Sequence, residues 1–289
     1  MLAAHVAFPA WEPHPDVWLL VGMLVAGYAT AIVRIGPLRT PAGKAPVSAF
    51  QASCFGAGAL ALLVASDWPV HDLGERYLFS VHMVQHLTYS LVAAPLLLLG
   101  TPTWLARMLL SPPALLRTVR ALCRLIPATI IFNLVVIVTH VPAVMNVVLH
   151  HALAHFFIHA VILISALIVW MPLVSPLPEV PRFHPLMRML FLFLQSIVPT
   201  VPASFLTFGD HPLYHFYETV PRLWNITALH DMQYAGLIMK IAGGVILWVV
   251  IGIVFFRWYA DEEEGEHRPH RASRDLDREL RELMRLNER

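Results

Sequence analysis

Histidines recur at intervals of four residues in two apolar segments of this sequence. His82 and His86 form one pair, and His151, His155 and His159 form a ladder in a later segment. Residues four apart on a helix lie one turn apart on the same face, so both imidazoles of a pair can bind one ion. A single pair is a weak signal, because hydrogen-bonded histidines inside a helix bundle give the same pattern. Two pairs at the same membrane depth favour a metal or cofactor site.

Further polar residues are expected at the same level, at the ends of two other apolar segments. His140 ends the fourth segment and Asp231 begins the seventh, so four helices would bring imidazole or carboxylate to one layer. Each residue also has a simpler explanation. His140 could be an ordinary interfacial histidine, and Asp231 could be a carboxylate that is favoured at a helix N-terminus. Asp231 is also the candidate to orient a ligating imidazole by accepting a hydrogen bond from its second nitrogen. Additional candidate ligands are His159, Met232 and Gln233.

The donor types restrict the choice of metal. Imidazole suits zinc, copper, iron and nickel, and thioether sulfur favours Cu(I). Met83, Met145 and Met232 adjoin the candidate ligands, although methionine is more often a gap filler in a core. The two cysteines, Cys54 and Cys123, supply no thiolate at this level. A thiol-free, histidine-rich site predicts a copper ion that is held moderately and passed onward, with a structural zinc site as the alternative and haem as a weaker one.

The composition indicates the kind of elements that must position these residues. The chain has 289 residues, of which 57% are hydrophobic and 13% are charged, about half the charged share of a soluble domain. Apolar runs near 20 residues exclude an ordinary soluble protein and predict helices that cross a membrane. The net charge of +1 without a basic face gives no reason to expect nucleic-acid binding. Seven spans are predicted, the fourth being the weakest: Val17–Val33, Val47–Ser66, Tyr77–Gly100, Ile126–Val141, Ala152–Met171, Arg188–Thr207 and Tyr234–Phe256.

Basic residues predict how the chain is oriented in the membrane. With the N-terminus outside, the outer segments contain only Arg76 and Arg222, and the other basic loop residues lie inside. The predicted fold is therefore an all-α seven-helix bundle with an outer N-terminus and an inner C-terminus. All histidines except His184, His267 and His270 then fall on the outer side or in the outer half of a span. Residues 1–260 form the transmembrane domain, and residues 261–289 form a charged cytoplasmic tail with a short amphipathic helix capped by Ser273.

Motifs across more than half of the chain resemble one known family. They run in the family's order from about Tyr77 to Gly244, and they begin with the third span, where His82-Met-Val-Gln-His86 precedes an apolar run ending in Gly-Thr-Pro102. In these motifs the sequence is similar to the CtaG-like cytochrome c oxidase assembly factors. The remaining matches are Asn133 with His140-Val-Pro142, His151-xxx-His155-Phe with Trp170-Met-Pro172, Pro212-Leu-Tyr-xx-Tyr217, and Asp231-x-Gln-x-Ala-Gly236 with Met239.

The resemblance implies seven spans and a role in assembling the oxidase, thought to involve copper supply to its buried copper centre. This chain departs from the usual pattern at Met232, where the family commonly has glutamine, and at Lys240, where tryptophan is usual; His159 is additional to the motif. The motif positions carried over from the family are His82, His86, His140, His151, His155, Asp231 and Gln233.

These observations predict a non-enzymatic, copper-binding assembly factor in the cell membrane. The expected partners are the lipid bilayer and either cytochrome c oxidase subunits or a periplasmic copper donor. Two other classes use similar residues: a membrane metalloenzyme or haem-binding oxidoreductase, and a metal transporter, which would need ligands near the midplane. Lys240 and seven helices suggest a retinal pigment, but the third span lacks the required carboxylate counter-ion. The predicted ligands are His82, His86, His151 and His155, with His140 and Asp231 as further or orienting groups.

Overall fold

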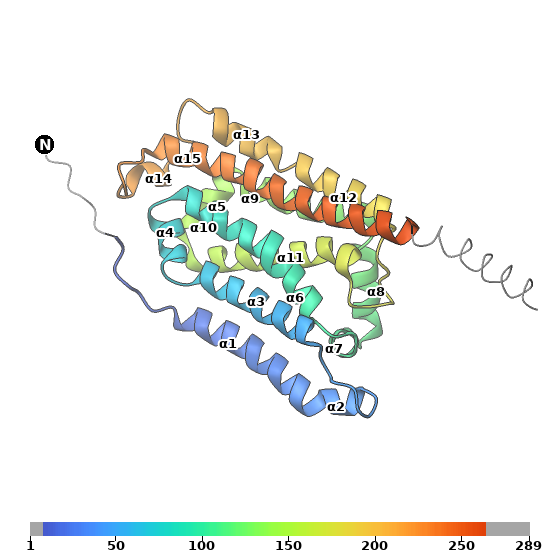
Figure 1. The fold of residues 1–289 in the computed structure, drawn as a ribbon. Helices are drawn as coiled ribbons and strands as arrows, with labels where there is room; N and C mark the ends of the chain where they lie inside the picture. The colour runs from blue at the N-terminus through green and yellow to red at the C-terminus, as the bar shows by residue number, and fades with distance from the viewer. Residues whose placement is uncertain (1–7, 264–289) are drawn as a thin grey trace, which may run out of the picture.

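The computed structural model describes residues 8–263, and within them every regular element is a helix (Figure 1). Six helical segments are long and apolar enough to cross a membrane. A seventh span results if α8 (Pro113–Leu122) and α9 (Leu125–Thr139), which meet at a 78° bend, are counted as one. The predicted all-α polytopic bundle is confirmed, and the fourth span is the one that depends on this bent pair. The predicted tail helix from Ser273 lies outside the described residues.

Two of the six spans, α3 and α11, are single α-helices, and the other four contain short π-helical turns or a break. The first span contains α1 (Pro15–Thr30), η1 (Ala31–Ile35) and α2 (Gly36–Arg39), and the second is α3 (Ala49–Ser66). The others comprise α5 (Phe79–Leu87), η2 (Thr88–Ala93) and α6 (Ala94–Gly100); α11 (Ala152–Val174); α12 (Pro185–Ile197) and α13 (Thr200–Phe208); and α15 (Ala228–Leu237), η3 (Ile238–Ala242) and the helix that continues to Glu263.

Short helices connect the spans at the two ends of the bundle. Those relevant to the site are α4 (Val70–Arg76) before α5 and α10 (Pro142–His150) before α11. The remaining two are α7 (Thr103–Leu109) and α14 (Phe216–Thr219).

The span formed by α5, η2 and α6 lies inside the bundle and contacts α3 and α11 (Figure 1). The π-helical turn η2 comes directly before Pro95, whose ring and missing N–H are incompatible with a regular helix interior. The Ser90 carbonyl in this turn accepts a hydrogen bond of 2.8 Å from the Trp170 indole of α11. This bond replaces intrahelical pairing in a region without water, and it ties α11 to the span that holds His82 and His86.

A second buried polar contact joins α9 to α12. The Asn133 amide donates to Gln195 Oε1 at 2.8 Å, and Gln195 Nε2 donates to the Thr129 hydroxyl at 3.2 Å. The short fourth span is thus held by side-chain hydrogen bonds as well as by apolar packing around Phe132 and Phe191.

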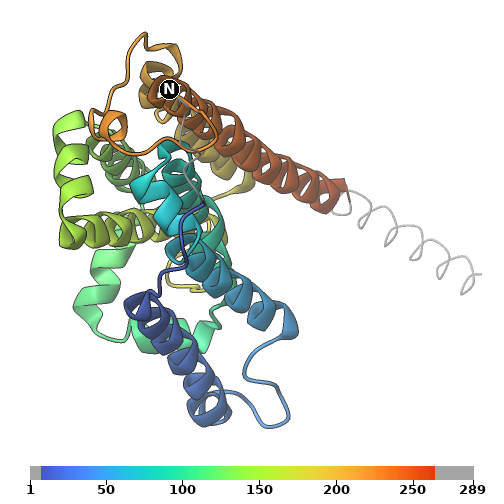
Figure 2. The same cartoon turned by 90° about the vertical axis from the view of Figure 1, so that its left-hand side faces the viewer.

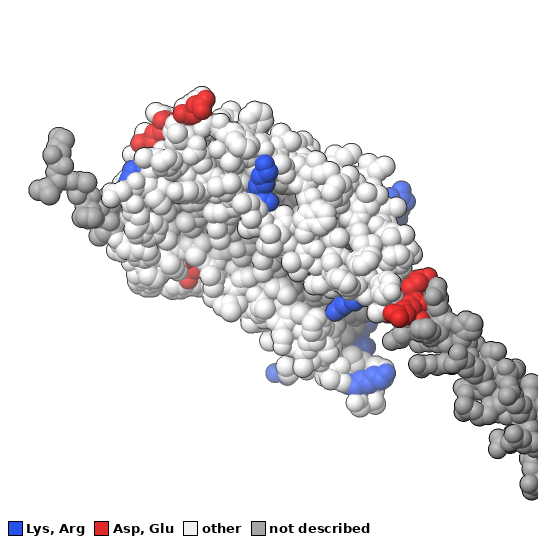
Figure 3. All heavy atoms as spheres, turned by 45° about the horizontal axis from the view of Figure 1, so that its top comes forward, with Lys and Arg blue, Asp and Glu red and all other residues white. Residues whose placement is uncertain are grey.

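Helix α1 lies at the edge of the bundle, and none of its residues is buried (Figure 2). It packs against α3, where the Tyr28 ring stacks on Phe55 with centroids 3.6 Å apart. The Tyr28 hydroxyl also donates to the Gly100 carbonyl at 2.8 Å. On the face shown in Figure 3, Asp and Glu gather at both ends of the bundle, near α14 and where the last helix ends, whereas most Lys and Arg lie toward the latter end.

Candidate metal centre

Four of the predicted histidines meet between α5 and α11. One nitrogen from each of His82, His155 and His159 can be chosen so that all three lie within 4.8 Å of one another. The His86 ring completes the group, with its centroid 4.3 Å from that of His82 and 5.3 Å from that of His159. The two HxxxH spacings therefore place their imidazoles face to face across one helix pair. These four residues are called the histidine cluster below.

The histidine cluster is buried and contains polar atoms without partners. His82 is fully buried and His155 is 6% exposed. Both ring nitrogens of His82, and Nε2 of His86, His155 and His159, have no hydrogen-bond partner. Buried polar atoms are nearly always satisfied in native proteins, and each exception requires an explanation. Several nitrogen lone pairs converging on one point are what a bound cation requires, so the donor set fits an imidazole-binding metal.

Glu75 of α4 orients the cluster from one side. Its carboxylate lies 2.5 Å from His155 Nδ1 and 2.9 Å from His71 Nε2. If His155 carries its proton on Nδ1 and donates it to Glu75, Nε2 keeps a free lone pair that can bind a metal. Carboxylate–histidine–metal arrangements of this kind hold the tautomer of a ligating imidazole and increase its basicity.

The electrostatics of α4 are consistent with an ionised Glu75. Burial alone would raise the pKa of this carboxyl, but hydrogen bonds from His155 and His71 outweigh it and lower the pKa to about 2. For His71, burial favours the neutral ring, yet the Glu75 carboxylate has the larger combined effect and raises the pKa. Glu75 is therefore a negative charge beside the cluster that favours a bound cation.

Gly74 allows α4 to approach α5 closely enough for these contacts. A Cβ atom at this position would lie 2.6 Å from Gln85 Oε1 and 3.0 Å from the His82 backbone nitrogen, so no side chain fits. The Gly74 carbonyl accepts a hydrogen bond of 2.8 Å from the buried Tyr217 hydroxyl. The glycine thus determines the distance between Glu75 and the histidines of α5.

His140 lies next to the histidine cluster without joining its ring contacts. Its Nδ1 donates to the Val136 carbonyl at 2.7 Å, which leaves Nε2 buried and unpartnered. His140 and His86 both line a cavity of about 80 Å³ enclosed by the helices around α9 and α11. His140 is the one candidate outside the cluster that keeps a free nitrogen toward the same region.

The other predicted site residues are placed elsewhere. Asp231, predicted as a ligand or an orienting acceptor, instead caps α5: its carboxylate accepts from the Phe79 amide at 2.7 Å and from the Ser80 amide and hydroxyl at 3.0 and 2.6 Å. The orienting contact belongs to Glu75 because α4, rather than α15, packs beside His155. His151 is exposed at the N-terminal end of α11, where the chain leaves the helix, so it does not extend the ladder.

Two further candidates on α15 also have other partners. Gln233 donates to the Gly209 carbonyl at 3.3 Å. The Met232 sulfur accepts from the Leu213 amide at 3.1 Å and packs with aromatic residues, including Phe79 and Tyr217. Met232 therefore supports the packing of the loop before α14, and the donor set of the cluster is nitrogen alone.

Sequence reasoning missed Glu75 and His71 as contributors to the site. The available signal was their spacing of four residues directly before the third span, which places them on one face if that segment is helical. The segment lies between the second and third predicted spans, and no helix was predicted there.

Comparison with known families agrees with the resemblance seen in the motifs. Residues 26–261 match the sequence model of the cytochrome c oxidase caa3 assembly factors, Caa3_CtaG. Searches of curated proteins and of solved structures gave no match. The matched region includes all four histidines of the cluster together with Glu75 and Asp231. This chain, a multi-pass membrane protein, belongs to the family of cytochrome c oxidase caa3 assembly factors.

Proposed function

We propose that this protein binds a copper ion in the histidine cluster and supplies it to cytochrome c oxidase during assembly. Family membership supports the assembly role and suggests a non-enzymatic protein. The copper ion is cargo in this proposal: His82, His86, His155 and His159 bind it, and Glu75 holds His155 in the tautomer that can ligate.

The observation that carries the proposal is the set of unpartnered nitrogens in a buried layer. Five ring nitrogens of the four histidines lack partners. Each neutral polar group left unpaired away from water destabilises the fold by roughly 1–3 kcal/mol. Among the described residues, five of the unpartnered buried atoms lie together in this cluster, where rings from two helices converge. Binding of a cation would satisfy these atoms and recover the cost.

The donor chemistry supports copper, with zinc as the competing ion. All-imidazole sites suit both metals, and the absence of thiolate from the cluster favours an ion that can be released. Copper is preferred because the resemblance implies supply to a copper centre of the oxidase. Haem is disfavoured by the ring spacing: the His82 and His155 centroids are 5.6 Å apart and the rings are stacked, which leaves no slot for a macrocycle.

The decisive experiment is elemental analysis of the detergent-purified protein after loading with copper or zinc. We expect one bound copper ion per chain, and its loss in His82→Ala and in His155→Ala. The matched control is His215→Ala, which removes an exposed histidine that also pairs with a carboxylate, Glu218. Unchanged copper stoichiometry in the two cluster variants would refute the proposal. If the protein retained zinc in preference to copper, the site would be a zinc site and copper supply would be refuted. A Soret band in the optical spectrum would favour haem.

Delivery to the oxidase also requires the cluster to open toward the outer side of the membrane. The distribution of basic residues predicts this orientation, and thiol labelling tests it. With a membrane-impermeant reagent on intact cells, Asp210→Cys in the loop before α14 should react and Thr40→Cys after α2 should not. The opposite labelling pattern would place the cluster on the inner side of the membrane and would contradict copper delivery on the outer side.

A further inference from the structure

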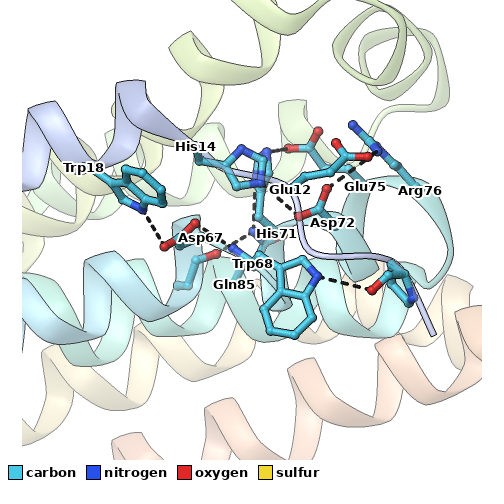
Figure 4. Close-up of polar contacts among 12 residues, drawn as sticks. Glu12, His14, Trp18, Asp67, Trp68, His71, Asp72, Glu75, Arg76 and Gln85 are labelled. Carbon is cyan, nitrogen blue, oxygen red and sulfur yellow. Dashed lines mark hydrogen bonds and ion pairs between the residues drawn. The ribbon is translucent and has the colours of Figure 1, made fainter.

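A second group of histidines and carboxylates lies between the N-terminal segment and α4, nearer the end of the bundle than the cluster (Figure 4). His14 Nε2 lies 2.9 Å from Asp72 Oδ2, and His71 Nε2 lies 2.9 Å from Glu75 Oε1. The His14 and His71 rings are in edge contact, with centroids 4.9 Å apart. These residues come from two elements that are distant in sequence, and they form one continuous polar patch.

Several further contacts hold the N-terminal segment in place over α4 (Figure 4). The Trp18 indole donates to Asp67 at 2.7 Å, and Arg76 pairs with Glu12 at 2.7 Å. Since no residue of α1 is buried, polar contacts are the main attachment at this end of the helix. They are sufficient to explain the position of α1, but they do not require histidine at position 14.

A cleft of about 350 Å³ runs from this patch to the histidine cluster. Its polar lining includes Asp16, His71 and Glu75 together with His155 and His159. His14 is not part of this lining and adjoins it through its ring contact with His71. The other wall of the cleft is apolar and is formed by α1, including Val17 and Leu20. The cleft is therefore a passage that connects two of the cluster imidazoles with the surface patch.

The imidazoles along this passage are spaced for stepwise transfer of an ion. Ring centroids are 4.9 Å apart from His14 to His71, 5.8 Å from His71 to His155, and 4.1 Å from His155 to His159. At such spacing an ion can gain a ligand of the next group before it loses a ligand of the last. A buried metal site needs a path of this kind, because its cation must exchange water for protein ligands on the way in.

We propose that His14, His71 and Glu75 form an access site, at which a copper ion binds before it moves to the histidine cluster. The inference rests on the proposed function, because it assumes that the cluster is the destination. His14 lies before residues 26–261, the part of the chain that matches the family model, so the access site depends on a residue outside the matched region. Imidazole with carboxylate binds such an ion more weakly than four imidazoles, and this difference drives the transfer inward.

The test compares the rate of copper loading with the amount bound at equilibrium, using the full-length protein in detergent and Cu²⁺ as the probe. His14→Gln keeps a hydrogen-bond donor for Asp72 but removes a good ligand. Val17→Trp narrows the cleft from its apolar wall and touches no polar contact. Both variants should load several-fold more slowly, and both should reach the same cluster stoichiometry as the parent protein.

The matched controls are His215→Gln, an exposed histidine with its own carboxylate partner, and Val25→Trp, on the same helix but not in the cleft lining. Both should load at the parental rate. Parental loading in His14→Gln would overturn the access site, even if Val17→Trp were slow. Reduced cluster stoichiometry in His14→Gln would also overturn it, since His14 would then act on the cluster itself. Failure of the proposed function gives a separate result, in which His82→Ala still binds copper.

Discussion

Two sets of buried polar side chains lie at the same end of the bundle, and they differ in whether their polar atoms have partners. Asp231 is fully buried, and its two carboxylate oxygens accept three hydrogen bonds from the start of α5. In the histidine cluster His82 and His155 are also buried and His86 and His159 are partly buried, yet most of the ring nitrogens have no partner. From the sequence alone, both sets were assigned to one metal site, the histidines as ligands and Asp231 as a further ligand or an orienting group.

This difference indicates that Asp231 has a structural role and that the histidine cluster is a candidate ligand set. A carboxylate at a helix N-terminus satisfies amide groups that have no partner within the helix. Phe79 and Ser80 lie at the start of α5 and have no local capping side chain, so Asp231 supplies one from α15. The cluster, by contrast, has groups that remain costly until something binds them. Satisfaction of hydrogen bonds therefore distinguishes the two sets better than membrane depth does.

The largest expected effect is on the structural side of this comparison. Asp231→Ala removes the acceptor of three hydrogen bonds and leaves buried donors at the start of α5, so it should lower the free energy of unfolding by roughly 3 kcal/mol. Thermal unfolding of the metal-free protein in detergent measures this. His82→Leu is the contrasting variant: it removes two unpartnered nitrogens and should leave metal-free stability unchanged or higher. Marked destabilisation by His82→Leu would show that these nitrogens have partners after all.

The second prediction concerns the ligand side. Glu75→Gln removes the charged acceptor that orients His155, and loss of such an acceptor typically costs about 10–100-fold in metal affinity. Copper titration against a competing chelator measures the change, with Glu218→Gln, another carboxylate paired with a histidine, as control. Unchanged affinity in Glu75→Gln would mean that His155 does not ligate through its free nitrogen.

The third prediction tests whether α4 must lie against α5. In Gly74→Ala the new methyl group would overlap Gln85 and crowd the His82 backbone, so α4 must shift and carry Glu75 away. Crowding of this kind should cost about 1–3 kcal/mol and weaken copper binding in parallel. Gly56→Ala is the matched control, because a Cβ atom there meets nothing within 4 Å. Equal melting temperatures for the two variants would contradict the tight α4–α5 contact.

The sequence predicted the fold and the meeting of His82 and His86 with His155, because both follow from local periodicity. His159, predicted only as an additional ligand, joins them in place of His151. Apolar runs determine the spans, and i, i+4 spacing determines which imidazoles share a face. Spacing does not determine which face of α4 or α15 meets that site. Asp231 and Glu75 are both acidic residues near the start of a span, and only the packing of α4 against α5, through Gly74, brings Glu75 to His155.

Helix ends were the other limit of prediction. His151 continues the spacing of four, but α11 begins at Ala152, so His151 lies beyond the regular helix and is exposed. The fourth span was expected to be weak, and α9 requires the bent partner α8 to reach a spanning length. Both outcomes depend on where a helix begins or ends, which neighbouring packing decides more than composition does.

The smallest effect expected is a pH dependence that arises from Glu75 and His71 together. The pKa of Glu75 falls from 4.5 to about 2 on folding, so its stabilising contribution is complete above pH 4.5 and is lost as the pH falls toward 2. The pKa of His71 is raised from 6.5, so its contribution is complete below pH 6.5 and is lost as the pH rises through the folded value. Glu75→Gln removes the first contribution and most of the second, because the raised pKa of His71 depends mainly on that carboxylate. The difference in melting temperature between the metal-free parent and Glu75→Gln should therefore be largest between about pH 4.5 and 6.5 and should narrow on both sides. A difference that widened steadily on acidification would indicate that the fold stabilises the protonated carboxyl, and Glu75 would then be unsuited to orient a ligating imidazole.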